Sequence, residues 1–396
     1  MRILMLNNEF PPLGGGTGTV NRALLERFAR VPRLEIDLFT SALGHRAERE
    51  QFAEHVQIYK VPVLNGNIHH STNRELLMYA AQAWWAALLR QRAMRYDLCM
   101  AWSAVPAGAV ALGLRRLGGP PYLVRVCGPD IPGFEERYGG VYPLLTPVIR
   151  ATWHGAAVVV AKCDAEAAMI HAVDRNVAVS LVPNGVDTAA FRPAVIGDSG
   201  PLRVICVARL IERKGQRQLI EAARRLRDRS IDIVVECVGE GDARADYQAY
   251  AQALGVADRI RFSGYVAREA IAQHYTASDV FVLPSYNEGM SVATLEALAA
   301  GLPALVTRTG GATELVAEGV NGAIFDWGDI ERLSMLLAEL AQDRGRLQRM
   351  GAASRERAAQ FSWDAAAARY IELFEELAAP GYGGAAPGTN ASRTAQ

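Results

Sequence analysis

Two glutamates that stand eight positions apart, Glu288 and Glu296, have the residue type and surroundings to bind a polar ligand. They flank a loop that follows an apolar run, and a predicted helix begins within that loop. The free backbone N–H groups and positive dipole end of a helix start bind phosphate or sugar hydroxyls. Gly289 allows close approach to the backbone, and Ser291 is a predicted N-cap. If the whole segment were helical, the two carboxylates would lie about 12 Å apart and could hold two ends of an extended ligand. A solvated glutamate on an ordinary helix is the alternative for each.

A basic cluster follows another apolar run, with Arg209 and Lys214 at its two ends. In open α/β sheets, ligands bind beyond the carboxyl ends of the strands. An arginine fork and a lysine point charge together make a clamp suited to a diphosphate. A solvated helix start is the alternative, and the expected position of the cluster opposite the glutamate loop favours the clamp.

A glycine-rich loop, Pro11–Gly18, lies between the first predicted strand and the first predicted helix. Its glycines, among them Gly15 and Gly16, permit close approach of the backbone to an anion. The loop is neither a G-K-[ST] phosphate loop nor a complete G-x-G-x-x-G motif, and alone it is weak evidence.

The elements that must position these residues are short apolar strands alternating with helical stretches, which is typical of parallel α/β layers. The predicted strands are 2–6, 35–40, 56–61, 98–102, 122–126, 157–161, 179–182, 203–208, 231–238, 260–263, 280–283, 304–307 and 323–325. Predicted helices include 19–29, 74–95, 216–229 and 292–300.

Clustered proline, glycine, asparagine and aspartate over 183–201 indicate a domain boundary near residues 190–200. We therefore predict an N-terminal domain over 1–195 and a C-terminal domain over 196–363. The composition of 380–396 predicts a disordered tail.

The composition limits the function classes. Lysine plus arginine and aspartate plus glutamate number 42 each, which argues against a general nucleic-acid binder. Five scattered cysteines without C-x-x-C spacing predict neither a disulfide framework nor a zinc site. No signal-peptide pattern and no apolar run of the roughly 18–20 residues needed to span a bilayer is seen. We therefore expect a cytoplasmic protein.

Together, these features resemble family 4 of the retaining glycosyltransferases, which have the GT-B fold. The resemblance extends from near residue 1 to about residue 378. The positions that carry it are the E-x7-E spacing from Glu288 to Glu296, the pair Arg209 and Lys214, the glycines 14–16 and the segment 183–187. It implies two Rossmann-like domains facing across a cleft, with a C-terminal helix over 364–379 that crosses back to the N-terminal domain.

The resemblance also implies a role for each matching residue. Arg209 and Lys214 would neutralise the diphosphate of a UDP- or GDP-sugar and stabilise it as leaving group. Glu296 would bind the ribose hydroxyls, and Glu288 a hydroxyl of the donor sugar. The remaining implied contacts come from Gly289, Met290 and Ser291 to sugar and phosphate, from Gly15 and Gly16 to the diphosphate, and from Gly239 and Val266 to the base.

The implied reaction is retaining, by front-face attack without a protein nucleophile. No metal or other cofactor is expected, because there is no D-x-D motif and the seven histidines, including the pair His69-His70, show no ligand spacing.

One position departs from the family pattern. Relatives often carry a histidine before G-x-D, where this chain has Cys127-Gly128-Pro129-Asp130. A proton-transfer role at position 127 is therefore in doubt, and Asp130 becomes the candidate for contact with acceptor or sugar. A turn-forming role after the proline is the alternative for Asp130.

The acceptor is expected on the N-terminal domain, as a glycan or a lipid-linked molecule. The helix predicted over 74–95 carries leucines, two tryptophans and four arginines, so it could lie on a membrane face. A buried helix with a solvated basic end is the alternative. A nucleotide-sugar epimerase or hydrolase and a non-catalytic sugar-nucleotide sensor remain rival functions. An NAD-dependent dehydrogenase is disfavoured by the glycine loop and the glutamate pair.

Overall fold

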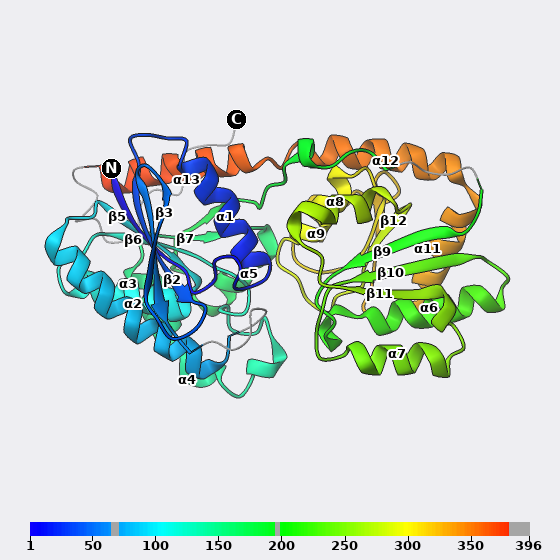
Figure 1. Cartoon of the computed structure of the whole chain (residues 1–396), viewed down its shortest axis with the longest axis horizontal. Helices are drawn as coiled ribbons and strands as arrows, with labels where there is room; N and C mark the ends of the chain where they lie inside the picture. The colour runs from blue at the N-terminus through cyan, green and yellow to red at the C-terminus, as the bar shows by residue number, and fades with distance from the viewer. Residues whose placement is uncertain (65–70, 195–198, 380–396) are drawn as a thin grey trace. The chain divides into compact units, whose positions relative to one another are not determined.

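The computed structural model describes residues 1–64, 71–194 and 199–379, which form two compact α/β units (Figure 1). The first unit consists of Met1–Pro183 together with the last helix, α13 (Trp363–Ala378). The second unit is Asn184–Ser362. The tail at 380–396, the pair His69-His70 and residues 195–198 lie outside the described residues.

The first unit is built on an eight-stranded sheet with the order β3-β4-β2-β1-β5-β6-β7-β8. All neighbours pair in parallel except β3 and β4, which are antiparallel. Its strands are β1 (Arg2–Leu6), β2 (Glu35–Ala42), β3 (Glu48–Ala53), β4 (Val56–Pro62), β5 (Leu98–Trp102), β6 (Tyr122–Arg125), β7 (Val158–Ala161) and β8 (Val179–Leu181).

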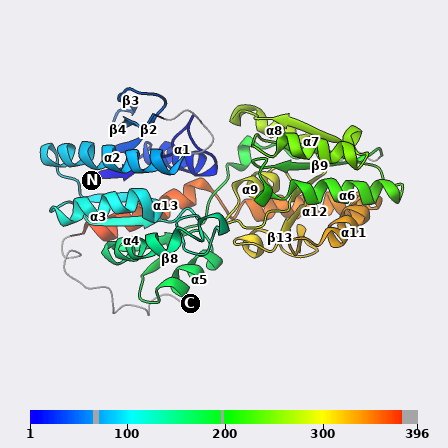
Figure 2. The same cartoon turned by 90° about the horizontal axis from the view of Figure 1, so that it is seen from below.

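Helices cover both faces of this sheet (Figure 2). On one face α2 (Asn73–Ala93), α3 (Ala109–Arg116) and α4 (Tyr142–Gly155) lie side by side. On the other face α1 (Gly16–Phe28) packs against α13, and α5 (Asp164–Val173) follows β7. Side chains of alternate strand residues point to opposite faces, so strands covered on both sides are apolar throughout. This explains why β5 is apolar throughout and why β1 is apolar after Arg2.

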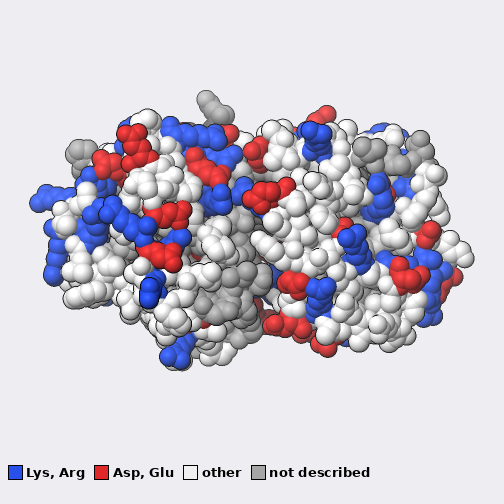
Figure 3. All heavy atoms as spheres, in the orientation of Figure 1, with Lys and Arg blue, Asp and Glu red and all other residues white. Residues whose placement is uncertain are grey.

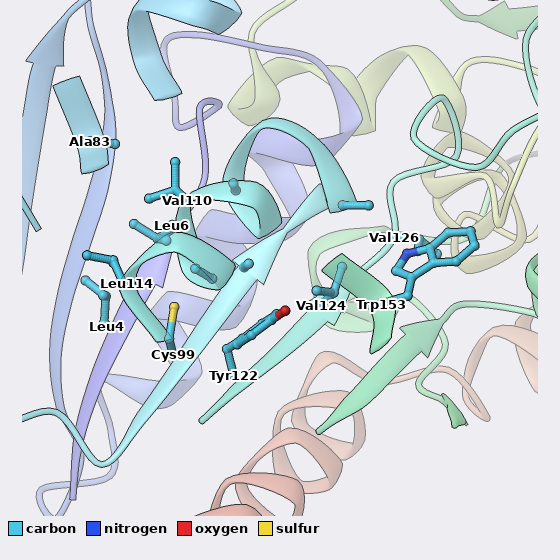
Figure 4. Packing of buried hydrophobic residues seen from close by; sticks show 14 of the residues in the cluster. Leu4, Leu6, Ala83, Cys99, Val110, Leu114, Tyr122, Val124, Val126 and Trp153 are labelled. Atoms are coloured by element: carbon cyan, nitrogen blue, oxygen red, sulfur yellow. The ribbon is translucent and has the colours of Figure 1, made fainter. Parts of the chain in front are cut away.

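One hydrophobic core of the first unit lies between the sheet and the layer of α2, α3 and α4 (Figure 4). Leu4 and Leu6 of β1 point into it, and Trp153 closes it from α4. Burying one such aromatic side chain contributes about 2–3 kcal/mol to folding. The strands are thereby held in register, and the loops at their carboxyl ends are fixed in place.

Strand β3 was not predicted, because its sequence is charged and lacks an apolar alternation. It forms through polar pairs with β4. Lys60 of β4 makes ion pairs with Glu48 and Glu50, and Arg49 donates to Gln57. Cross-strand charge pairs stabilise an antiparallel pair without burial, and charges on an edge strand discourage further pairing.

The second unit is built on a six-stranded, wholly parallel sheet with the order β11-β10-β9-β12-β13-β14. Its strands are β9 (Leu202–Val207), β10 (Ile233–Val238), β11 (Ile260–Gly264), β12 (Val280–Leu283), β13 (Ala304–Thr307) and β14 (Gly322–Phe325). Its helices are α6 (Gln216–Asp228), α7 (Arg244–Ala253), α8 (Arg268–Thr276), α9 (Val292–Ala299), α10 (Ala312–Leu315), α11 (Ile330–Gln342) and α12 (Arg344–Ala358). The central strands β9 and β12 are neighbours, so the loops after them meet at one edge.

The structure divides the chain earlier than predicted, between Pro183 and Asn184 rather than between residues 195 and 196. The Asn184 amide donates to the carbonyl of Met290, and Val186 pairs with Ser362. These bonds attach the connecting segment to the second unit. Helix α13 belongs to the first unit, where its Phe374 packs on Phe28.

Charged side chains of both signs are interspersed over the visible face of each unit (Figure 3). Many form exposed ion pairs, such as Arg2–Glu35 and Arg224–Asp228, and pairs of this kind contribute little to stability. Within the part of the chain that the structure covers, none of the helices has both the length and the apolar composition that crossing a membrane requires.

Candidate functional site

The two loops after β9 and β12 meet through a largely buried ion pair between Lys214 and Glu288. The side chains retain only 14% of their accessible surface. The backbone N–H of Tyr286 donates to the carbonyl of Arg213 at 2.7 Å, which ties the loops together beside the pair. Gly215 has a φ of +72°, and a Cβ there would lie 1.9 Å from the carbonyl oxygen of Pro284. Only glycine allows this approach, so the pair depends on it.

The ion pair sets the charge state of both groups. Burial alone would raise the pKa of Glu288, but the neighbouring Lys214 ammonium outweighs it and holds the pKa below its ordinary value. Burial lowers the pKa of Lys214, against the attraction of Glu288, and nearby Arg213 and Arg209 lower it further. Lys214, Arg213 and Arg209 therefore concentrate positive charge at the carboxyl edge of β9. The carboxylate of Glu288 balances part of this charge.

The segment from Glu288 to Ser291 forms the entry to α9. Ser291 caps the helix, because its hydroxyl accepts from the backbone N–H of Thr294 at 3.1 Å. Met290 is buried, and its carbonyl accepts from the Asn184 side chain at 2.8 Å. A Cβ at Gly311 would lie 2.9 Å from the Cα of Met290. The loop that contains Gly289 is thus held by the hydrogen bond from Asn184 and by the close packing of Gly311.

The contribution of Asn184 was not predicted. In the sequence it belongs to a turn-rich segment, which favours its interpretation as part of a linker. An asparagine directly after a proline can bond to distant backbone as well as to its own turn, and nothing local distinguishes the two. Asn184 and Met290 are 106 positions apart, so no local sequence pattern could predict their hydrogen bond.

Glu296 lies on α9 and contacts Tyr275 of α8. The Tyr275 hydroxyl donates to the Glu296 carboxylate at 3.0 Å and is itself buried. Burial raises the pKa of Glu296 to about 7, and the Tyr275 hydrogen bond and the charge of Arg268 offset part of that rise. The carboxyl therefore changes its charge near neutral pH. Tyr275 was not predicted, because it occupies an ordinary helical position.

Arg209 and Gly239 lie at the ends of the adjacent strands β9 and β10. The side-chain amide of Gln216 donates to the carbonyl of Arg209 at 3.0 Å. A Cβ at Gly239 would lie 2.1 Å from the carbonyl of Ala208, and its φ is +136°. Both the packing and the backbone conformation therefore require glycine at position 239, whether or not a ligand binds there. Val266, which follows β11, is half-buried.

The glycine loop of the first unit contains two kinds of glycine. Gly14 has a φ of +91°, and a Cβ on Gly18 would lie 2.8 Å from the carbonyl of Leu13, so the fold demands both. No described atom lies within 4 Å of a Cβ built on Gly15 or Gly16. Both are exposed at the start of α1, which has no side-chain cap. Uncapped backbone N–H groups at a helix start suit an anion.

Asp130 is buried, and both of its carboxylate oxygens accept backbone hydrogen bonds. One accepts from Ala104 at 2.6 Å and the other from Cys127 at 2.7 Å. Burial raises the pKa of Asp130, and the two N–H donors offset part of that rise. These contacts make Asp130 a brace between the loops after β5 and β6, and its contact with acceptor or sugar stays a prediction. Burial also raises the pKa of the Cys127 thiol to about 12, so it stays protonated at neutral pH.

We expect Asp130→Ala to lower the free energy of unfolding by about 3 kcal/mol, because it leaves two buried N–H groups without an acceptor. Urea unfolding would measure this. Asp97→Ala is the control, since Asp97 is exposed and accepts one backbone bond, from Arg2; its loss should be about 1 kcal/mol or less. Unchanged stability of Asp130→Ala with lost turnover would instead support contact with substrate.

The structure distributes the predicted residues over both units. Gly15, Gly16 and Asp130 belong to the first, and the rest belong to the second. Among the described residues, no three His, Cys, Asp or Glu side chains lie together in a way that could hold a metal ion.

Two Rossmann-like α/β units, with a last helix that returns to the first, define the GT-B class of proteins. Solved structures agree. The chain matches sucrose-phosphate synthase from Thermosynechococcus elongatus with a TM-score of 0.85 and 21% identity, over 95% of this chain and 99% of that one. It matches the Anabaena protein HepE in complex with UDP and glucose with a TM-score of 0.75 and 20% identity, over 95% and 100%.

The chain belongs to glycosyltransferase family 4 and is a transferase enzyme. The profile of Glycosyltransferase Family 4 matches residues 14–190, and that of Glycosyl transferases group 1 matches residues 188–357. A similar protein is the GDP-mannose-dependent alpha-(1-6)-phosphatidylinositol monomannoside mannosyltransferase of Mycobacterium tuberculosis, 27% identical over 94% of this chain and 97% of that protein. The D-inositol 3-phosphate glycosyltransferase of Corynebacterium diphtheriae is 34% identical over 43% of this chain and 42% of that protein.

Proposed function

We propose that this glycosyltransferase moves a sugar from a UDP- or GDP-sugar to a hydroxyl of a glycan or lipid-linked acceptor, with retention of configuration and without a metal. The buried Lys214–Glu288 pair at the edge between β9 and β12 carries the proposal. A buried cation beside a carboxylate can serve the two ends of one reaction: the cation meets a departing diphosphate and the carboxylate meets sugar hydroxyls.

In the proposed reaction the bond between the anomeric carbon and the diphosphate oxygen breaks as the acceptor oxygen bonds to the same face of that carbon. The acceptor proton passes to the departing phosphate. Lys214 and Arg209 stabilise the negative charge that develops on the diphosphate. Because these cations act where a metal would otherwise do so, we propose that no metal or other cofactor is needed.

The nucleoside is proposed to lie along the same edge of the sheet. The ribose hydroxyls would donate to Glu296, which Tyr275 holds in place. The base would lie at the ends of β10 and β11, next to Gly239 and Val266, where Tyr265 is 64% exposed. Backbone N–H groups of Gly289, Met290 and Ser291 would contact the sugar and phosphate.

Gly15 and Gly16, the exposed glycines at the start of α1, are proposed to contact the diphosphate. We expect Gly16→Val to lower kcat/KM at least tenfold, because its side chain would enter the space left by the glycine, where a loss of about 1.4 kcal/mol is tenfold. Steady-state kinetics with varied donor would measure this. Gly140→Val is a matched control, since a Cβ there also meets no described atom. Equal kinetics of the two variants would contradict the contact.

The acceptor is proposed to be a glycan or a lipid-linked molecule, and GDP-mannose is the first donor to test because the Mycobacterium tuberculosis relative is named for it. Helix α2 buries one face in the core but exposes Leu77, Trp85 and Leu89, with exposed Arg74 and Arg92 near its ends. An apolar stripe with flanking arginines suits an anionic membrane surface. We propose peripheral membrane contact through this face and no role for nucleic acid.

Labelled UDP- and GDP-sugars tested with and without candidate acceptors provide the test. We expect nucleotide release that depends on acceptor, an NMR spectrum of the product that shows the donor's anomeric configuration, and unchanged rates with EDTA. Inverted product would exclude retention, and loss of the rate with EDTA would exclude metal independence. Acceptor-independent nucleotide release or conversion of the donor would favour a hydrolase or an epimerase, and donor binding without turnover would favour a sensor.

A further inference from the structure

Two aromatic side chains are exposed together beside the Lys214–Glu288 pair. Tyr286 retains 43% of its accessible surface and Trp327 retains 40%. Their rings meet edge to face, with centroids 5.4 Å apart and planes at 83°. They follow β12 and β14, so they lie at the carboxyl edge of the second unit's sheet. We call Tyr286 and Trp327 the aromatic platform.

The backbone beneath the platform is firmly held. The N–H of Tyr286 donates to the carbonyl of Arg213, and the N–H of Gly328 donates to the side chain of Gln218 at 2.9 Å. A Cβ on Gly215 would lie 2.8 Å from the Trp327 ring, so the indole packs directly against that glycine. Two large rings are thus fixed in position and still exposed, although their burial would favour folding.

The surroundings of the platform suit a sugar ring. A pyranose has an apolar C–H face that packs on an aromatic face, and a rim of hydroxyls that needs hydrogen-bonding partners. Next to Tyr286, the guanidinium of Arg213 donates to the Asn287 side chain at 3.0 Å. An aromatic surface with an arginine and an amide at its edge offers both kinds of contact.

The position of the platform separates it from the proposed base site. The base is proposed to lie at the ends of β10 and β11, on one side of β9. The platform follows β12 and β14, on the other side of β9. Glu288, proposed to bind the donor sugar, is two residues from Tyr286. The platform therefore adjoins the sugar end of the donor site.

We propose that Tyr286 and Trp327 bind a pyranose ring of a carbohydrate acceptor, which stacks on the face of one aromatic ring and meets the other, nearly perpendicular ring at its side. The inference rests on the proposed function and adds an acceptor subsite in the nucleotide-binding unit. One ring supplies the stacking face and the other an apolar contact at the side of the sugar, while Arg213 and Asn287 supply hydrogen bonds to the hydroxyls.

Saturation-transfer NMR tests the platform with the methyl α-glycosides of mannose, glucose, galactose and N-acetylglucosamine at millimolar concentration. At least one glycoside should receive saturation, mainly at the C–H protons of one ring face. Tyr286→Ala and Trp327→Ala should abolish the signal, and Trp327→Phe should retain part of it. Val320→Ala is the control, because Val320 is an exposed apolar residue of the same unit. No signal from any glycoside, or equal signals in all variants, would overturn the proposal.

UDP and GDP binding, measured on the same samples, separates this inference from the proposed function. Unchanged nucleotide binding in the Tyr286 and Trp327 variants is expected. Nucleotide binding by the parent protein without a glycoside signal would remove the platform and leave the proposed function standing. Weakened nucleotide binding in the variants would assign the rings to the donor and overturn the acceptor subsite. With an active acceptor, Trp327→Ala should raise the acceptor KM about tenfold and leave the donor KM unchanged.

Discussion

Replacement of Lys214 by methionine is expected to lower kcat/KM by a factor of about a thousand and to destabilise the protein by about 3–5 kcal/mol. The first effect follows from losing the cation proposed to stabilise the departing diphosphate. The second follows because Glu288 would be left as a buried charge without its partner. Steady-state kinetics and urea unfolding measure the two effects separately.

The double variant Lys214→Met/Glu288→Leu separates catalysis from folding. Two apolar side chains of similar volume can replace a buried ion pair at little cost in stability. We therefore expect stability to return towards that of the parent while activity stays lost. Recovery of both would show that the pair serves folding alone, contrary to the proposed role in the reaction.

A second ion pair of the same unit provides the control. Asp279 is buried and pairs with Arg203 at the start of β9 and β12, the end of these strands opposite the candidate site. Asp279→Asn should also lower stability, but with little change in kcat per folded molecule. A thousandfold loss in this variant would mean that activity reports folding rather than chemistry.

The candidate site could be predicted where one local pattern determines position and chemistry together. The apolar run of β12, the glycine after Glu288 and the cap at Ser291 predict a strand, a loop and a helix start, and the structure has all three. The α/β fold class follows equally from the alternation of strands and helices, and the GT-B comparisons confirm it.

Contacts that depend on strand order could not be read from the sequence. Lys214 and Glu288 are 74 positions apart and meet because β12 returns to lie beside β9. Tyr275 meets Glu296 because α8 packs beside α9, although its helical position looks like any core position. The same limit explains Asp130: its sequence shows a turn, and only the assembled loops reveal two backbone donors. Strand β3 escaped prediction because charge pairs, rather than burial, stabilise it.

Donor binding is expected to weaken about tenfold between pH 8 and pH 6, because the pKa of Glu296 is raised to about 7. The charged carboxylate accepts from both ribose hydroxyls, whereas the protonated carboxyl is a weaker acceptor and one of its oxygens carries the proton. Titration of UDP or GDP across this range measures it. The effect on stability has the opposite sign: a raised carboxyl pKa stabilises the fold below the ordinary value of 4.5, and this contribution is lost as pH rises through about 7. Lowering the pH should therefore increase the contribution of Glu296 to folding stability and decrease the affinity for the donor.

Three variants assign this pH dependence to Glu296. Glu296→Ala should weaken binding about 10- to 100-fold at pH 8, because a hydrogen bond to a charged group is lost, and should flatten the pH profile. Tyr275→Phe removes a hydrogen bond that favours the carboxylate, so the pH at which donor binding begins to weaken should rise. Arg268→Gln should move it the same way by less, since Arg268 acts through charge alone. An unchanged profile in Glu296→Ala would place the titrating group elsewhere and remove Glu296 from the ribose site.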